Sequence, residues 1–235
     1  MQVVTLWMTM IAVIAMADTG YWAVDASGDW DNSSNWTNTA NPPNGTGDVA
    51  FLTSELTDNR YVSLGTNVVL GKLILANEGY IIGTTAQTSP KLIFQNNGGP
   101  SEFIYTNLNH RKKGTTIYHP IQVEDTLNID LTDTANTMPS FREGFIGDSN
   151  SVVNIDYKIE GGSYVVGIEE NQGFYGQMNL FRTGSDRYAL GFRFRDADSL
   201  PSGGSGSVKV HQGVCLEFYY SISEDDAAVF DYVGD

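Results

Sequence analysis

The sequence contains a single cysteine, Cys215, in a chain of 235 residues. One cysteine cannot form an internal disulfide, so the fold must be held by its hydrophobic core and its backbone hydrogen bonds. Cys215 lies in the alternating run VKVHQGVCLEFYY, which predicts a strand. We expect this residue to be buried and structural rather than a catalytic nucleophile.

Basic residues are also few, because 13 Lys and Arg stand against 28 Asp and Glu, giving a formal net charge of −15. Nucleic acids and anionic membranes are bound through basic patches, so this balance argues against both as partners. The one basic cluster, His110-Arg111-Lys112-Lys113, is too short for a nucleic-acid footprint. An acidic surface suits a protein that stays soluble outside the cell.

Helix signals and long apolar runs are nearly absent. Gly or Asn interrupts most windows in which apolar residues would recur at helical spacing. One apolar segment, residues 1–17 (MQVVTLWMTMIAVIAMA), carries no charged side chain and ends in the small-x-small pattern Ala15-Met16-Ala17. We interpret it as a secretory signal peptide, with a buried first strand or helix as the alternative, and expect no membrane span.

Short β-type runs are abundant. They are DVAFLT, YVSL, VVLGKLILA, YIIG, KLIFQ, EFIYT, TIYHPIQV, TLNIDL, VVNIDYKI, SYVVGI, GQMNLFR, ALGFRFR, SVKVHQ, VCLEFYY and AAVFDYV. Turn-forming residues separate them, which predicts an all-β protein: a sandwich, a barrel or a solenoid. Consecutive apolar residues in VVLGKLILA and recurring Gly-rich turns favour the solenoid, in which each coil covers the next.

Three segments carry a distinctive order of motifs. The opening contains Trp22, Trp30, Asn35-Trp36, Pro42-Pro43, Gly47-Asp48 and then the apolar Val49 to Phe51. The second segment is VVLGKLILANEGYII, residues 68–82. The third contains Tyr175-Gly176, Ala189-Leu190-Gly191, Gly206-Ser207-Val208, Val210, Gly213 and Leu216.

These motifs resemble the bacterial autotransporter-associated β-strand repeat proteins, which are large secreted or surface proteins. The resemblance implies a right-handed parallel β-helix with a Trp-rich N-terminal cap, and it implies no shared chemistry. The family repeat carries Gly-Gly-Thr after its Tyr, whereas this chain has Gly176-Gln177-Met178.

On this basis we divide the chain into a signal peptide (1–17), an N-terminal cap segment (18–52) and a β-helix solenoid (53–235). The final run AAVFDYVGD resembles sequence from the middle of a solenoid. We therefore expect a fragment of a longer protein, with self-association at an open solenoid end.

Three tryptophans, Trp22, Trp30 and Trp36, lie directly before the first predicted coil. One interpretation is a carbohydrate-binding platform, because aromatic faces pack on the apolar faces of sugars. The other is a lid, since the first coil of a solenoid exposes its core and an unpaired strand edge. We favour the lid, because burial of three indoles would contribute several kcal/mol, taking roughly 25 cal/mol per Å².

Two arginines form a second candidate carbohydrate site. In the run FRFRDAD, Arg193 and Arg195 alternate with phenylalanines, so both should face outward on one strand. Together with the neighbouring Asp196 and Asp198 they suit an acidic sugar. The alternative is an exposed strand face whose charge pairs contribute little.

No sequence pattern indicates a resident metal or cofactor. Acidic groups such as Asp29/Asp31 and Glu224-Asp225-Asp226 lack EF-hand spacing, and the three histidines lack zinc spacing. We therefore predict no cofactor and no metal site, with calcium as the alternative.

The functional prediction is a non-catalytic, secreted or cell-surface protein with a structural or adhesive role. We assign no catalytic residues and expect extracellular glycans, or the surface of a host or neighbouring cell, as partners. The alternative is a carbohydrate-binding or polysaccharide-cleaving β-helix protein. A jelly-roll binding module is the third interpretation.

Overall fold

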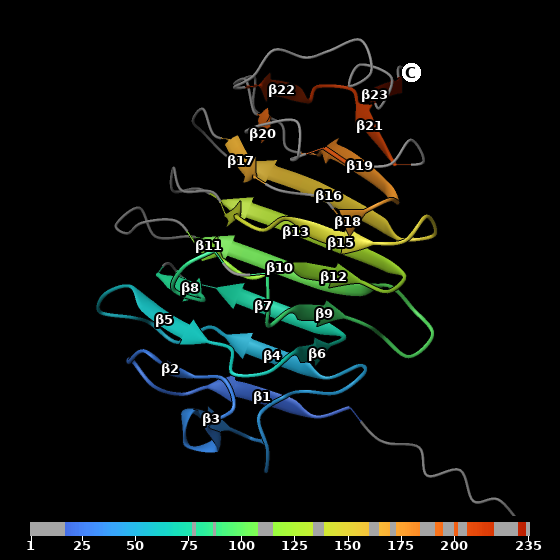
Figure 1. Cartoon of the computed structure of the whole chain (residues 1–235). Helices are drawn as coiled ribbons and strands as arrows, with labels where there is room; N and C mark the ends of the chain where they lie inside the picture. Colours follow the sequence, from blue (N-terminus) through green and yellow to red (C-terminus); the bar gives the residue numbers. More distant parts are fainter. Residues whose placement is uncertain are drawn as a thin grey trace, which may run out of the picture.

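The computed structural model describes residues 17–76, 79–86, 88–107, 115–133, 139–159, 165–169, 173–183, 191–194, 200–201, 206–218 and 230–233. Apart from one short 3-10 helix, η1 (Ser33–Asn35), the regular structure of these residues is β. Three sheets enclose one core, and successive turns of the chain stack into a β-solenoid (Figure 1). The predicted all-β parallel β-helix is confirmed.

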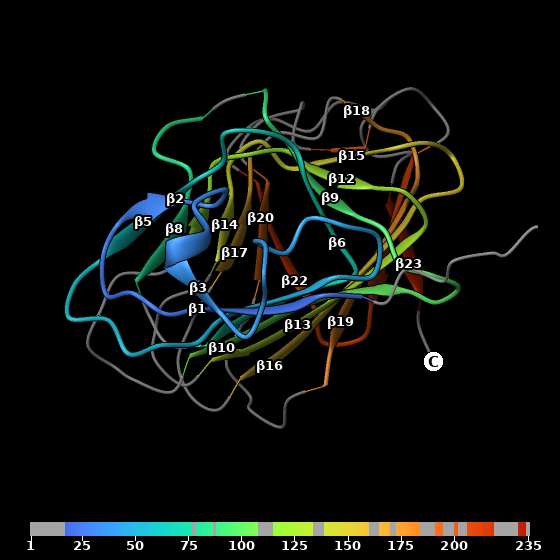
Figure 2. The same cartoon turned by 90° about the horizontal axis from the view of Figure 1, so that it is seen from below.

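Each complete turn contributes one strand to each sheet, and Figure 2 shows the sheets arranged around the solenoid axis. Sheet A contains, in spatial order, β23 (Phe230–Val233), β21 (Ser207–His211), β19 (Gln177–Arg182), β16 (Val152–Ile159), β13 (Thr126–Asp133), β10 (Ser101–Asn107), β7 (Lys72–Ala76), β4 (Val49–Leu52), β1 (Thr19–Trp22) and β3 (Trp36–Thr37). Sheet B contains β2 (Gly28–Asp29), β5 (Arg60–Ser63), β8 (Tyr80–Ile82), β11 (Thr116–Ile117), β14 (Ser140–Phe141), β17 (Val165–Ile168), β20 (Gly191–Phe194) and β22 (Cys215–Phe218). Sheet C contains β18 (Gly173–Phe174), β15 (Phe145–Gly147), β12 (Ile121–Val123), β9 (Leu92–Phe94) and β6 (Val68–Leu70).

The register of sheet A aligns the buried residues of each strand with the buried residues of the next strand. Leu75, Tyr105, Leu131 and Tyr157 occupy equivalent positions on β7, β10, β13 and β16, and all four are buried. Because successive side chains point to opposite faces of a strand, the residues between them form columns on the outer face. Parallel pairing therefore builds the core and an ordered outer surface at the same time. β1 and β4 already pair in parallel, so this stacking begins within residues 18–52.

A chain of aromatic rings crosses the core between the sheets. Phe103 of β10 meets Phe94 of β9 and Phe141 of β14, with ring centroids 6.4 and 5.9 Å apart. Phe145 of β15 lies 5.2 Å from Phe141 and 6.4 Å from Phe174 of β18. Edge and tilted contacts of this kind add about 0.5–1.5 kcal/mol each beyond burial. They connect successive coils without a disulfide.

The run VVLGKLILA contains two strands where the sequence suggested one. β6 belongs to sheet C and β7 to sheet A, and Gly71 forms the corner between them. A Cβ at Gly71 would lie 2.6 Å from the Cα of Gly47, so only glycine fits this close approach of two coils. The continuous apolar run reflects burial against two sides of the core.

The prediction that Cys215 is buried is wrong, because it is exposed at the start of β22. Its neighbours Val214 and Leu216 pack against the core. A residue between two inward-facing neighbours of a strand must point outward.

Gly176 provides a test of the tight stacking of coils. A Cβ at Gly176 would lie 2.0 Å from the carbonyl oxygen of Ser151 and 2.8 Å from its carbonyl carbon. Because the obstruction is backbone, we expect Gly176→Ala to lower the free energy of unfolding by about 3 kcal/mol. The measurement is urea denaturation followed by far-UV circular dichroism.

Gly99 is the matched control, since no atom lies within 4 Å of a Cβ built there. Gly99→Ala should change the free energy of unfolding by less than about 0.5 kcal/mol. Equal stability of the two variants would contradict the close approach of coils at Gly176.

Candidate functional site

The three tryptophans form one cluster at the end of the solenoid where β1, β2 and β3 lie (Figure 1). Trp22, Trp30 and Trp36 are 1%, 0% and 5% exposed. Trp36 meets both other indoles, with ring centroids 5.3 Å from Trp22 and 4.7 Å from Trp30. The interplanar angles of 86° and 62° are the edge contacts that aromatic rings prefer.

Each indole N–H donates to a backbone carbonyl. Trp22 donates to Val24 at 3.0 Å, Trp30 to Pro43 at 2.9 Å, and Trp36 to Trp30 at 2.8 Å. The polar atoms are therefore satisfied and the ring faces are covered. Stacking on a sugar would require this packing to open, so the structure offers no carbohydrate platform at these three residues.

The same segment covers the strand edge. β3 runs antiparallel to β1, with Trp22 opposite Trp36, and it forms the end of sheet A. An additional parallel strand would need the edge of β1 that β3 occupies. The cap thus covers the core at this end and occupies the outer edge of β1 in sheet A.

Of the two predicted arginines, the structure describes Arg193. It lies half-buried on β20 in sheet B, between the buried Phe192 and Phe194, so it faces outward as predicted. Arg195, Asp196 and Asp198 lie outside the described residues, as do the basic cluster at 110–113 and residues 1–16.

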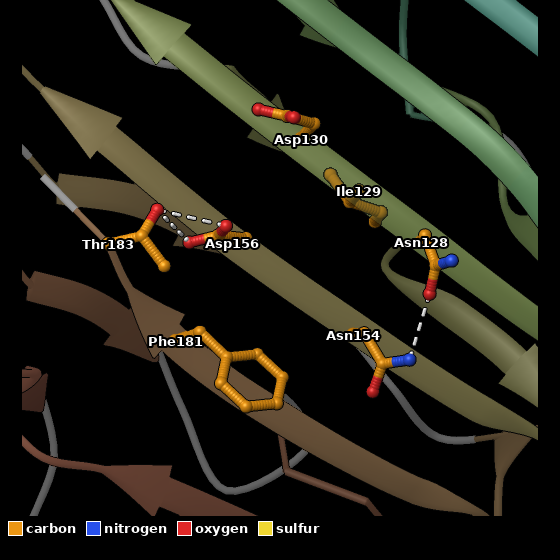
Figure 3. Close-up of a pocket in the computed structure, with 7 residues that line it drawn as sticks. All are labelled: Asn128, Ile129, Asp130, Asn154, Asp156, Phe181 and Thr183. Atoms are coloured by element: carbon orange, nitrogen blue, oxygen red, sulfur yellow. Dashed lines mark hydrogen bonds between the residues drawn. The ribbon is translucent and has the colours of Figure 1, made fainter.

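A groove of about 390 Å³ lies on the outer face of sheet A, over β13, β16 and β19. Its lining residues come from these successive strands and the residue that follows the last one (Figure 3). They are Asn128, Ile129, Asp130, Asn154, Asp156, Phe181 and Thr183. Ile129 is itself buried in the core, so the other six side chains supply the chemistry.

A chain of amide hydrogen bonds supports one side of the groove. Gln177 Nε2 donates to Asn179 Oδ1 at 2.7 Å, and Asn179 Nδ2 donates to Asn154 Oδ1 at 2.7 Å. Asn154 Nδ2 then donates to Asn128 Oδ1 at 2.8 Å (Figure 3). The two bonds between asparagines step in one direction along the solenoid, from β19 to β16 to β13, and Asn128 Nδ2 is left without a partner among the described residues.

Two carboxylates lie beside the amides. Asp130 and Asp156 occupy equivalent positions on β13 and β16. Lys158 Nζ lies 2.5 Å from Asp130 and 3.7 Å from Asp156, and the hydrogen bond that it donates to Asp130 raises the pKa of Lys158. Thr183 Oγ1 donates to the Asp156 carboxylate at 3.0 Å. With one ammonium between two carboxylates, the group has a formal charge of −1.

An aromatic ring completes the groove. Phe181 occupies the position on β19 next to Asp156, and it is half-buried. Its ring stacks on His211 of β21, with centroids 4.1 Å apart and planes 25° from parallel. The groove therefore combines an apolar ring, amide donors and carboxylate acceptors, which is a combination suited to binding an uncharged polar molecule.

The sequence contains a signal for this groove that known site motifs do not capture. Asn128-Ile129-Asp130 and Asn154-Ile155-Asp156 are identical tripeptides 26 residues apart. Their separation matches one turn of the solenoid, so Asn meets Asn and Asp meets Asp on neighbouring strands. Repetition at this period indicates residues that share one outer face.

Comparisons with protein-family models, curated proteins and solved structures found no match for this chain. Within the described residues, no group of three or more His, Cys, Asp or Glu side chains is placed to hold a metal ion. The described part of the chain also contains no helix that is long and apolar enough to cross a membrane.

Trp30 tests the role of the cap. We expect Trp30→Ala to lower the free energy of unfolding by about 4 kcal/mol, because it empties a fully buried site. Trp30→Phe keeps a ring but loses the hydrogen bond to Pro43, so it should lower the free energy of unfolding by only about 1–2 kcal/mol. Urea denaturation of both variants provides the measurement. A loss below about 1 kcal/mol for Trp30→Ala would contradict the cap.

Proposed function

We propose that this chain is a non-catalytic structural and adhesive module of a secreted or cell-surface protein. In this proposal it is a rigid solenoid that meets glycans or a neighbouring cell surface through the outer face of sheet A. The observation that carries the proposal is the unbroken register of sheet A, which arranges outward side chains in columns along the solenoid.

One outward column has the composition of a contact surface. Tyr21, Phe51, Ile74 and Ile104 follow one another on β1, β4, β7 and β10, and each is half-buried. Tyr21 and Phe51 stack in parallel with centroids 4.4 Å apart. Apolar groups that continue over several coils favour contact with another surface.

Further support comes from how the fold is stabilised. The solenoid relies on burial and parallel hydrogen bonding, and its own tryptophans close the core at the capped end. A chain with this architecture suits an extracellular spacer that holds a binding face away from its point of attachment. The apolar segment 1–17, interpreted as a signal peptide, and the resemblance to autotransporter repeat proteins agree with that location.

The adhesive role can be measured with beads that carry the full chain. We expect them to be retained under flow on layers of intact bacterial or epithelial cells. Ile74→Thr combined with Ile104→Thr should lower retention several-fold, because it removes apolar surface while keeping β-branched side chains in the strands.

The control is Tyr61→Thr, which removes an exposed aromatic side chain from β5 in sheet B and should leave retention unchanged. Absence of retention on every surface would contradict the adhesive role. An equal loss in both variants would contradict the assignment of sheet A as the contact face.

A further inference from the structure

We propose that the groove over β13, β16 and β19 binds a neutral saccharide. This inference rests on the proposed adhesive function and names the ligand class of its contact face. The site differs from the two carbohydrate sites expected from the sequence, because the tryptophans are buried in the cap and Arg193 lies on sheet B.

The carboxylates provide acceptors for sugar hydroxyls. A carboxylate has about four lone-pair positions, so Asp130 keeps free acceptor capacity beside Lys158, and Asp156 keeps it beside Thr183. Hydrogen bonds to an ionised acceptor are about twice as strong as those between neutral groups. Two such acceptors on adjacent strands suit a pair of neighbouring hydroxyl groups.

The amide chain provides the complementary donor. Gln177, Asn179 and Asn154 each donate toward the next residue, and Asn128 Nδ2 at the end has no partner among the described residues. Hydrogen bonds in a chain polarise one another, which strengthens the donor at its end. Asn128 can therefore donate to a hydroxyl or ring oxygen, while the other amides hold it in place.

Phe181 provides the apolar contact. Its stacking on His211 and its position on β19 fix the ring beside Asp156. Adjacent strands lie about 4.8 Å apart, so the acidic pair and the ring span about 10 Å along the solenoid. A pyranose has polar hydroxyls at its edge and apolar C–H groups on its faces. The carboxylates on β13 and β16 and the aromatic ring on β19 match both surfaces of a pyranose.

The charge of the groove distinguishes neutral from acidic sugars. Asp130, Asp156 and Lys158 together contribute −1, and the whole chain carries −15. Uronate and sulfated polymers would meet repulsion both at the site and over the surface. We therefore expect neutral oligosaccharides to bind and oligogalacturonate to be excluded.

The test is isothermal titration of the full chain with cellohexaose, xylohexaose, mannohexaose, maltohexaose and chitohexaose, with hexagalacturonate as the acidic comparison. We expect at least one neutral oligosaccharide to bind. Asp156→Asn should weaken that binding about tenfold, because it removes the charge of the acceptor. Phe181→Leu should weaken it about fivefold, because it removes the flat apolar face.

One substitution on the same sheet and one near the capped end serve as controls. Phe51→Leu removes the ring that stacks on Tyr21 in sheet A, and Asp25→Asn removes a carboxylate that pairs with Arg60, both away from the groove. Neither should change saccharide affinity. Each variant is compared at equal folded fraction, established by its urea denaturation curve.

Failure to bind any neutral oligosaccharide, preference for hexagalacturonate, or equal losses in the site and control variants would overturn the saccharide site. Retention of coated beads on cells without saccharide binding would overturn this inference while leaving the adhesive function standing. The chain length of the oligosaccharide is also measured after binding. This measurement tests the non-catalytic function separately from the saccharide site. Cleavage that Asp156→Asn abolishes would contradict the non-catalytic function and leave the saccharide assignment in place.

Discussion

The structure depends on one constraint, which is that each coil must present an apolar residue directly over an apolar residue of the coil before it. A parallel strand has a side-chain period of two, and a slip of one residue would turn its core residues outward. The columns of sheet A meet this requirement from β4 to β21. Register therefore determines the core and, as a direct consequence, the composition of the outer face.

That consequence explains the groove. Asn128 and Asn154 are far apart in the sequence, yet they are hydrogen-bonded neighbours because one turn of the solenoid separates them. The same turn brings Asp130 beside Asp156. A side-chain cluster of this kind needs no specialised loop. It requires the same residue type at the same place in successive coils, and rigid strands then hold the groups in position.

A solenoid must also close its ends, and the tryptophans serve this need at the first coil. Burial of an indole contributes several kcal/mol, taking about 25 cal/mol per Å² over 150–250 Å². Stacking on another ring contributes only about 0.5–1.5 kcal/mol. Opening the cap so that Trp30 could stack on a sugar would therefore cost more free energy than the stacking contact would contribute. Energetics favour a structural role for this cluster.

Much of the fold could be predicted from the sequence, because alternation and β-branched residues identify strands by a local rule. Short strands such as β14 and β18 escaped detection, since two residues give no periodicity. Cys215 was misassigned because its local run was recognised as a strand without deciding which face it occupies. The groove could not be predicted from local patterns, because it depends on the number of residues in each turn of the solenoid. In the sequence, only the repeated Asn-Ile-Asp tripeptide indicates that number.

Pulsed electron paramagnetic resonance tests the central claim of in-register stacking most directly. Spin labels are placed at Lys72→Cys and Lys209→Cys in a Cys215→Ser background. The two sites share one outer column and are separated by five strand pairings. At about 4.8 Å per pairing, in-register stacking predicts a narrow distribution of label-to-label distances centred at about 24 Å. A broad distribution, or one centred beyond about 35 Å, would contradict the stacked register.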